Sequence, residues 1–472
     1  MRCRRHGAKP KGDGIMKCAR LLLICIIVLC GCAGQQAGFV QEPYSDEAAY
    51  LEARQRLIEA ERALRFDTGI TLTPKEEEAN RRLMALKREE IERTRGHFPP
   101  AHSFLESKTR ILIDESRVLK IMKRMPKGGI LHVHGYTLGD FRWLVSHATY
   151  LPNCYVYQGD KKRPVRGTLR FFQEPPGDGW MPISELRKAA GDVQEFDEDI
   201  HRSITLGEED LAQPDIWTEF SNCFRRSSGL LASDSVRDDY YRKMFKDLAE
   251  ENIQYVEFRG AGRSAFQALL SEILRDHPDF EVKFIPQAMR SASRKQLAEA
   301  LERLLDRREA DPHRILGFDL VEEEDKTHTN LFFLSELLNA RREAERRNIT
   351  LPLYLHSGES NWAENENLYD AILLDAKRIG HGLALVKHPL LMQIVRERDI
   401  AIEVCPLSNQ VLGFISDLRN HPTVHYINSG LPVVLSPDDP GIMRHTFSYV
   451  KKSTPPVSQS FKHGYLLCLG SL

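Results

Sequence analysis

Short apolar runs alternate with longer amphipathic segments over most of the chain. Between the runs, apolar residues recur at helical spacing, as in Ser293–Arg308 and Leu331–Arg347. The runs are Gly129–His134, Ile253–Arg259, Val282–Ala288, Ile315–Val321, Leu351–His356, Arg378–His381, Ile400–Val404 and Pro432–Ser436. Strands that alternate with helices are typical of βα units and a parallel sheet. The pattern therefore predicts an α/β fold, a closed TIM (β/α)8 barrel.

Charged segments with apolar residues at helical spacing precede the first run. Asp46–Arg65 and Pro74–Arg95 predict two amphipathic helices, and a third helix is expected near Ser103–Met125. Such helices lie outside a barrel, either as a solvated arm or as a dimerisation element. The long stretch Gly135–Asn252 after the first run must hold an insertion, expected at about residues 145–215, because one helix does not fill it.

The N-terminus predicts a processing segment. Lys17 and Arg20 flank the apolar run Leu21–Cys30, which is too short to span a bilayer. The run ends in Leu29–Cys32, which resembles a bacterial lipobox, where the last Cys is acylated; a plain signal peptide is the alternative. We therefore expect a lipoprotein signal peptide at 1–32, a tether at 33–45, a helical region at 46–125 and the barrel at 126–472. The protein would be exported and lipid-anchored through Cys32, its only membrane contact.

Composition excludes several classes of function. The 472 residues hold 66 Lys+Arg against 67 Asp+Glu, for a net charge of −1, so no basic excess favours nucleic-acid binding. Five of the nine cysteines lie within the first 32 residues, and the others are widely spaced. The chain therefore has no disulfide framework and no Cys-x-x-Cys zinc motif.

The candidate catalytic and metal-binding residues lie at the carboxyl ends of the predicted strands, where barrel enzymes have their active sites. The polar residues there are His132 and His134 on the first run, His356 and Glu359 on the fifth, His381 on the sixth, and Asp438 and Asp439 on the eighth. His132 and His134 are two apart on a strand and face the same side. Each motif alone is weak evidence, but together they predict a metallohydrolase.

Three histidines and one carboxylate suit a catalytic zinc with an open position for water. Water on zinc has its pKa brought toward neutrality and becomes a nucleophile. In a hydrolytic deamination, His381 can take or steer the water proton and Glu359 can protonate a ring nitrogen. Asp439 can orient the water or the purine.

The order of these motifs resembles the adenosine deaminase family, most closely its growth-factor-related, secreted adenosine deaminase 2 type. The sequence segments that match the family are Met125–Gly129, Gly317–Val321, Arg378–Gly382, Glu403–Gln410, Ser416–Pro422 and Glu78–Met84. The resemblance covers roughly residues 50–445, and its motifs are highly specific.

The resemblance implies roles for particular residues. One zinc per chain would be held by His132, His134, His356 and Asp438. Glu359 would donate a proton to the purine, while His381 and Asp439 attend the attacking water. The substrate-binding candidates are Glu195 and Trp217 near the ribose, Glu322, and Asp439. The N-terminal helices imply a homodimer.

Two departures from the family pattern bear on the substrate. The family has an Asp just after the second histidine, which binds the ribose 5′-hydroxyl, where this chain has Gly135 and Tyr136. Glu322 stands where the family has a Gly whose backbone N–H reaches the purine. We expect deamination of adenosine or 2′-deoxyadenosine to the inosine product and ammonia. The alternatives are a deaminase of another purine nucleoside or base, and a non-catalytic growth-factor-like binding protein on the same fold.

Overall fold

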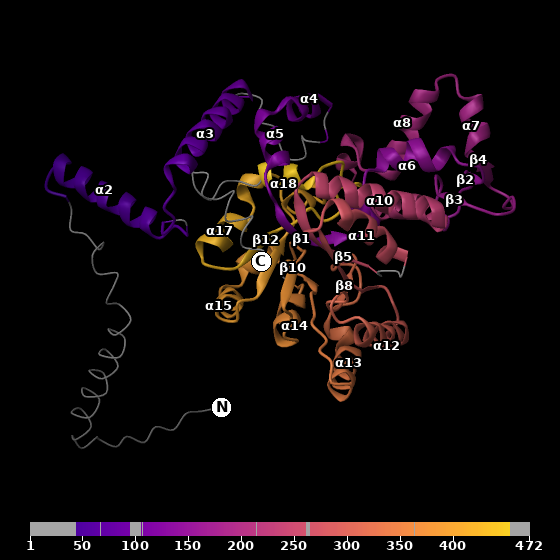
Figure 1. Ribbon diagram of the computed structural model, residues 1–472. Coiled ribbons are helices and arrows are strands. Elements are labelled where there is room, and N and C mark those ends of the chain that lie inside the picture. The colour runs from indigo at the N-terminus through magenta and orange to yellow at the C-terminus, as the bar shows by residue number, and fades with distance from the viewer. Residues whose placement is uncertain are drawn as a thin grey trace, which may run out of the picture. The chain divides into compact units, whose positions relative to one another are not determined.

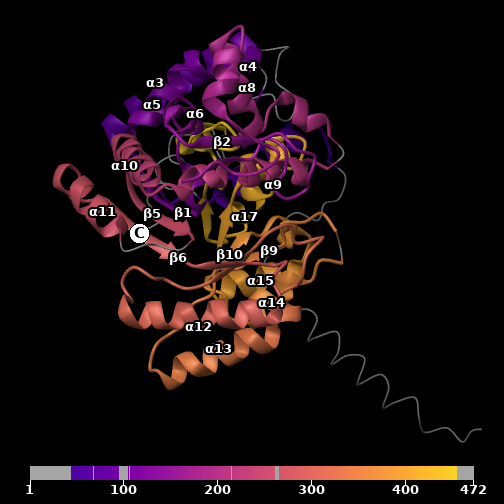
Figure 2. The same cartoon turned by 90° about the vertical axis from the view of Figure 1, so that its right-hand side faces the viewer.

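In the described residues, eight parallel strand positions close into a barrel, and Figures 1 and 2 show its strands and the surrounding helices. The strands are β1 (Gly128–His134), β5 (Ile253–Arg259), β6 (Glu281–Ile285) with β7 (Gln287–Met289), β8 (Asp319–Val321), β9 (His356–Ser357), β10 (Arg378–His381), β11 (Ala401–Val404) and β12 (Val433–Leu435). Ladders join β1–β5–β6, β7–β8 and β9–β10–β11–β12. Single parallel bridges, Phe284 to Ile315 and Phe318 to Leu353, join these sheets, and Val133 to Asp438 closes the ring. The predicted TIM barrel is confirmed.

Helices follow the strands. They are α11 (Ala265–Asp276), α12 (Arg294–Ala310), α13 (Leu334–Arg346), α14 (Asn367–Leu373), α15 (Pro389–Glu397), α16 (Pro406–Val411), α17 (Thr423–Asn428) and α18 (Phe447–Ser453). Helix α12 begins at a capping box, in which Ser293 and Gln296 bond each other's backbone. It buries Leu297, Leu301, Leu304 and Leu305, the spacing of one helical face. Short 3-10 turns are η6 (Leu331–Phe333), η7 (Leu383–Lys387) and η8 (Leu418–Asn420).

The insertion between β1 and β5 contains a small sheet of its own, which the sequence pattern did not predict. Its elements are η2 (Gly135–Leu138), α6 (Phe141–His147), η3 (Ala148–Tyr150), β2 (Cys154–Tyr157), β3 (Leu169–Phe171), β4 (Trp180–Pro182), α7 (Ile183–Ala189), α8 (Val193–Ile204), η4 (Glu208–Ala212), α9 (Ile216–Ser227), η5 (Ser228–Ala232) and α10 (Asp234–Glu250). Strand β2 pairs antiparallel with β3 and β4. Elements α6 to α8 and the sheet gather together beside the barrel (Figures 1 and 2).

The described residues of the N-terminal region form four helices rather than the three expected. Helices α2 (Glu47–Ala63) and α3 (Pro74–Thr94) match the prediction, but α4 (Ser107–Glu115) and α5 (Arg117–Arg124) replace the single helix expected near Ser103–Met125. The helix is interrupted at Ser116. The Ser116 hydroxyl accepts a hydrogen bond from the Leu119 backbone N–H and donates one to Glu90 of α3. Serine favours such a capping position over a helix interior, which explains the break.

The structure is a computed structural model that describes residues 44–66, 68–94, 105, 107–213, 215–260, 265–362 and 364–453. The predicted leader and Cys32 lie outside these residues. Within the described part, no helix is both long and apolar enough to cross a membrane. The chain divides into two compact units after Arg65, so α2 is separate from the barrel unit. Helix α2 exposes Tyr50, Leu51 and Leu57, and its role in a dimer stays a prediction.

Candidate active site

Three imidazoles and one carboxylate converge at the carboxyl ends of the barrel strands. The Nε2 atoms of His132 and His134 lie 3.5 and 3.3 Å from Oδ1 of Asp438. His134 Nε2 lies 3.2 Å from His356 Nε2, and ligand atoms of the three histidines all lie within 4.8 Å of one another. The alternation of strand side chains thus brings His132 and His134 to one point, as the sequence predicts.

These four side chains fit a metal ion. Nε2 of His132 and Oδ1 of Asp438 are buried, yet neither makes a hydrogen bond to any described residue. Burial lowers the pKa of His134 to about 4 and that of His356 well below its ordinary value, so both rings are neutral and able to ligate. Burial opposes ionisation of Asp438, but nearby His132 and His381 hold its pKa well below the usual range. Three nitrogens and one carboxylate oxygen are donors typical of catalytic zinc.

A second layer of acceptors orients the three rings. The Nδ1 atom of His132 lies 2.9 Å from Glu403, that of His356 lies 2.8 Å from Asp319, and that of His134 lies 3.2 Å from Gln287. Because each acceptor is an oxygen, each Nδ1 carries the proton and each Nε2 lone pair faces the common point. Such partners fix the tautomer of a ligating histidine.

Sequence reasoning missed these three acceptors. Asp319 and Glu403 lie in two of the segments that match the family, Gly317–Val321 and Glu403–Gln410. That match was the only feature of the sequence that could have indicated a role for them. Gln287 stands in no motif.

Buried arginines pair with the acceptor carboxylates, although burial still raises the pKa of Asp319 above its ordinary value. Arg259 donates to Asp319 at 3.0 Å and also to Glu403, and all three side chains are fully buried. Arg378 donates to Glu403 at 2.5 Å and to Glu257. Burial alone would raise the pKa of Glu403, but Arg259 and Arg378 hold it well below its ordinary value. The two arginines therefore favour the ionised form of Glu403, the acceptor for His132.

Glu359 is a buried carboxyl beside this cluster. Its own backbone N–H and that of Gly358 donate to the Glu324 carboxylate, at 2.8 and 3.1 Å, which fixes the turn after β9. Burial first, and then the charges of Asp438 and Glu324, raise the pKa of Glu359 well above its ordinary value. This shift favours the protonated carboxyl, the form that can give a proton.

His381 and Asp439 complete the constellation. His381 Nε2 lies 3.7 Å from Asp438 Oδ2, and its Nδ1 lies 3.1 Å from Glu359 Oε1. Asp439 accepts a 2.5 Å hydrogen bond from the Thr137 hydroxyl. Burial and the neighbouring Asp438 raise the pKa of Asp439 well above its usual range. All three acid–base candidates are therefore buried within reach of the histidine cluster.

The described contacts of the substrate-binding candidates Glu195 and Trp217 are with residues other than the three clustered histidines. Glu195 lies on α8 with two thirds of its side chain exposed, pairs with Arg202 at 2.9 Å, and among the described residues makes no contact with the histidines. Trp217 on α9 is half-buried and lies edge-on to Phe414, with ring centroids 6.2 Å apart. The roles of Glu195 and Trp217 stay predictions.

The two positions that depart from the family pattern have unusual backbones. Glu322 has φ of 109°, a region that favours glycine, and its carboxylate accepts a 2.8 Å hydrogen bond from the Ser291 backbone. Gly135 has φ of 47°, and a Cβ added there would meet only the Arg259 carbonyl oxygen, at 3.7 Å. Position 135 thus has room for an aspartate, which tolerates this conformation better than most residues.

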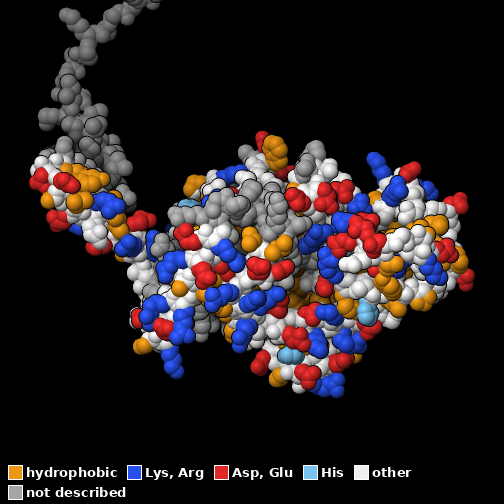
Figure 3. Space-filling model, turned by 90° about the horizontal axis from the view of Figure 1, so that it is seen from above, with side chains coloured by type: hydrophobic (Ala, Val, Ile, Leu, Met, Phe, Trp, Pro, Cys, Tyr) orange, Lys and Arg blue, Asp and Glu red, His pale blue; other side chains and the backbone are white. Residues whose placement is uncertain are grey.

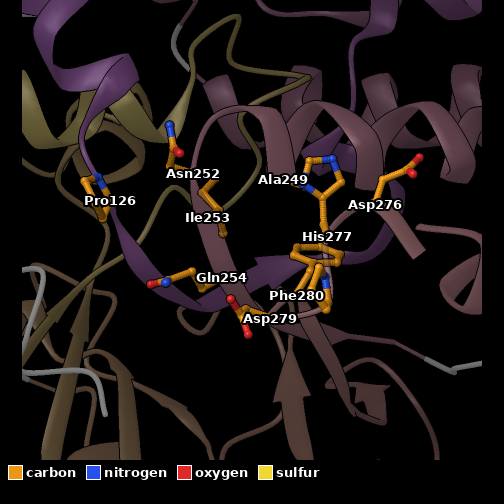
Figure 4. A pocket seen from close by; sticks show the side chains of 10 residues that line it. Pro126, Ala249, Asn252, Ile253, Gln254, Asp276, His277, Asp279 and Phe280 are labelled. Atoms are coloured by element: carbon orange, nitrogen blue, oxygen red, sulfur yellow. The ribbon is translucent and has the colours of Figure 1, made fainter. Parts of the chain in front are cut away.

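A cavity of about 280 Å³ opens at the other end of the strands (Figure 4). It is lined by Pro126, Ala249, Asn252, Ile253, Gln254, Asp276, His277, Pro278, Asp279 and Phe280. These residues surround the start of β5, whereas the histidines lie where the strands end. It is therefore not the site of the histidine cluster. Figure 3 shows acidic and basic side chains intermingled on the face drawn, in keeping with the balanced charge.

Family profiles match most of the chain. The family described as Adenosine deaminase matches residues 207–455, and Adenosine/AMP deaminase N-terminal matches residues 22–122. The chain belongs to the adenosine deaminase family. It is 32% identical to Adenosine deaminase 2 of Dictyostelium discoideum, over 85% of this chain and 78% of that one. It is 33% identical to Adenosine deaminase 2 of Homo sapiens, over 83% and 81%.

Solved structures agree on the fold of this adenosine deaminase family member. Adenine deaminase from Arthrobacter aurescens aligns with a TM-score of 0.53 at 19% identity, over 74% of this chain and 93% of that one. The Arabidopsis N6-mAMP deaminase aligns with a TM-score of 0.52 at 18% identity, over 75% and 93%. At these identities the likeness supports the barrel and not a particular substrate.

Proposed function

We propose that the protein is a zinc-dependent deaminase that hydrolyses adenosine and 2′-deoxyadenosine to the inosine product and ammonia. The observation that carries the proposal is a buried carboxyl, Glu359, whose pKa is raised by burial, beside three histidines and Asp438. Membership of the adenosine deaminase family supports the reaction class. The relatives named Adenosine deaminase 2 support adenosine as the substrate. The test is release of ammonia and inosine by the purified, zinc-loaded protein.

The proposed mechanism assigns one task to each buried group. His132, His134, His356 and Asp438 hold zinc, which when bound supplies Lewis-acid chemistry that makes water nucleophilic near neutral pH. Glu359 protonates a ring nitrogen of the purine, which makes the adjacent carbon electrophilic. His381 hydrogen-bonds the attacking water, and Asp439, held by Thr137, orients the water or the purine. Glu403, Asp319 and Gln287 keep the ligand rings aimed.

Two other functions are weighed against this one. A deaminase of another purine would use the same acid–base groups, and the replaced aspartate at Gly135 and the bulky Glu322 are the reasons to consider it. A non-catalytic binding protein on the same fold has no need of a buried carboxyl with a raised pKa, or of an oxygen acceptor at each of the three candidate ligand histidines. The intact set therefore favours an enzyme.

Restoring the family residues at both departures is expected to strengthen adenosine binding. Gly135→Asp adds a hydrogen bond to the ribose 5′-hydroxyl, worth about 0.5–1.5 kcal/mol or more if charged. Glu322→Gly removes the strained backbone at this position and restores the glycine that, by the family pattern, faces the purine. Steady-state kinetics on the single and double variants should show a lower KM for adenosine with a smaller change in kcat.

Gly430→Asp is the matched control, because Gly430 also has a positive φ, 74°, and its added Cβ meets no atom nearer than 3.7 Å. If the restoring variants leave kcat/KM for adenosine unchanged while another purine is turned over faster, the substrate is that other purine.

We further propose export with a lipid anchor at Cys32, supported by the lipobox-like word Leu29–Cys32 after a short apolar run. Expression in a bacterium with a fatty-acid analogue should label the wild type and not Cys32→Ser, and the variant should move to the soluble fraction. Membrane fractionation and labelling that are unchanged in Cys32→Ser would contradict the anchor.

A further inference from the structure

A line of buried hydrogen bonds leads to His381 from the segment before α17. The Thr423 backbone nitrogen lies 3.1 Å from Nδ1 of His421, and Nε2 of His421 lies 3.1 Å from Oδ1 of Asn409. The Asn409 Nδ2 atom lies 3.1 Å from Nδ1 of His381. All four residues are at most 3% exposed, so water does not compete for these bonds.

The direction of each bond follows from its first donor. A backbone N–H can only donate, so Nδ1 of His421 is an acceptor and the proton of this neutral ring is on Nε2. Burial lowers the pKa of His421 to about 3, which keeps the ring neutral. His421 therefore donates from Nε2 to Asn409, and this fixes which end of the Asn409 amide is the oxygen.

The orientation of the Asn409 amide determines whether Nδ1 of His381 donates or accepts its hydrogen bond. With its oxygen facing His421, Asn409 presents its NH2 group to Nδ1 of His381, which must then accept. A neutral His381 consequently carries its proton on Nε2, the nitrogen that lies 3.7 Å from Asp438 Oδ2. Glu359 Oε1 lies 3.1 Å from the same Nδ1 but makes no hydrogen bond to any described residue, so it does not compete with Asn409 for that nitrogen.

We propose that Asn409 and His421 are positioning residues that hold His381 in the Nε2–H tautomer. The proposal rests on the proposed deaminase function. His381 then donates a hydrogen bond to the oxygen of the attacking water and steers it. Because a bound zinc would bring the pKa of this water toward neutrality, the water proton can leave to solvent, and His381 need not remove it. Of the two roles open to His381 from sequence, taking or steering the water proton, the hydrogen-bond directions select the second.

Asn409→Asp is the sharpest test, because a carboxylate can only accept and would draw the His381 proton to Nδ1. We expect kcat for adenosine to fall by at least about tenfold, the scale on which a misplaced acid–base proton acts. KM and zinc content should stay close to those of the wild type. A kcat within about twofold of the wild type, a change well below the usual contribution of a positioned acid–base group, would overturn the proposal.

Variants of His421 distinguish an effect of hydrogen-bond direction from an effect of side-chain packing. His421→Gln keeps a donor toward Asn409, whereas His421→Leu keeps bulk without one. The glutamine variant should recover most of the kcat that the leucine variant loses, and equal losses in the two would contradict a role in direction. His425→Leu, on an exposed neighbour in α17, is the control. The same pair decides the question if Asn409→Asp does not fold.

A tautomer measurement makes the outcome independent of activity. Nitrogen NMR of histidine-labelled protein distinguishes Nε2–H from Nδ1–H rings, with His381 assigned by its loss in His381→Asn. We expect Nε2–H in the wild type and Nδ1–H in Asn409→Asp. A wild-type His381 protonated on Nδ1 would refute the proposal even if adenosine is turned over. An Nε2–H ring in a protein that does not deaminate adenosine would leave the tautomer assignment standing while the proposed function fails.

Discussion

Glu359→Gln is expected to lower kcat for adenosine by about 10²–10⁴-fold, the usual contribution of a positioned general acid. Glutamine keeps the size and one carbonyl oxygen of the side chain but has no acidic proton. The Glu359 backbone bond to Glu324 does not depend on the side chain, so the turn after β9 should persist. Zinc content and KM should therefore stay near wild-type values while turnover is lost.

Steady-state kinetics with elemental analysis on the same preparation makes this measurement. Glu345→Gln, the same change at an exposed position of α13, serves as the control and should be silent. A loss of less than about tenfold, equivalent to about 1.4 kcal/mol, would show that Glu359 is not the proton donor.

Removal of a proposed zinc ligand is expected to abolish both metal binding and turnover. His132→Ala takes away a nitrogen aimed at the common point, and Asp438→Ala takes away the carboxylate that two histidines face. About one zinc per chain is expected in the wild type, as in mononuclear catalytic sites, and much less in either variant. Elemental analysis after dialysis gives the answer directly.

The exposed His313 provides the matched control, since His313→Ala removes an imidazole without touching the barrel interior. Circular dichroism should confirm that each ligand variant keeps its fold. Full zinc occupancy in both His132→Ala and Asp438→Ala would contradict the ligand assignment.

Local patterns in the sequence predicted the barrel and the convergence of its polar residues. Each of the eight apolar runs overlaps a strand, although the fifth, Leu351–His356, shares only His356 with β9. The overlap arises because a buried parallel strand needs a continuous apolar run whatever its neighbours. The motif residues converge because parallel strands in a barrel end at the same face, so the ends of β1, β9, β10 and β12 meet. Chain order alone was therefore enough to group His132, His356, His381 and Asp438.

The sequence could not predict hydrogen-bond partners that are brought together only by the three-dimensional packing of the chain. Gln287 and Asp319 come from neighbouring strands, yet each bonds a histidine of a different strand, and only the closed barrel sets those pairings. The break at Ser116 depends on Glu90, 26 residues earlier, because their hydrogen bond favours a cap over one continuous helix. The small sheet of the insertion has strands of only three or four residues, too short for a clear alternation of polar and apolar side chains.

The most direct test of the account is the assay of the purified, zinc-loaded protein with adenosine, with ammonia and inosine both quantified. We predict that the two products form in equal amounts, that 2′-deoxyadenosine reacts likewise, and that Glu359→Gln forms neither at a comparable rate. Adenine and other purine nucleosides belong in the same panel, because Gly135 and Glu322 depart from the family pattern. A protein that binds zinc fully yet releases no ammonia from adenosine would contradict the proposed function.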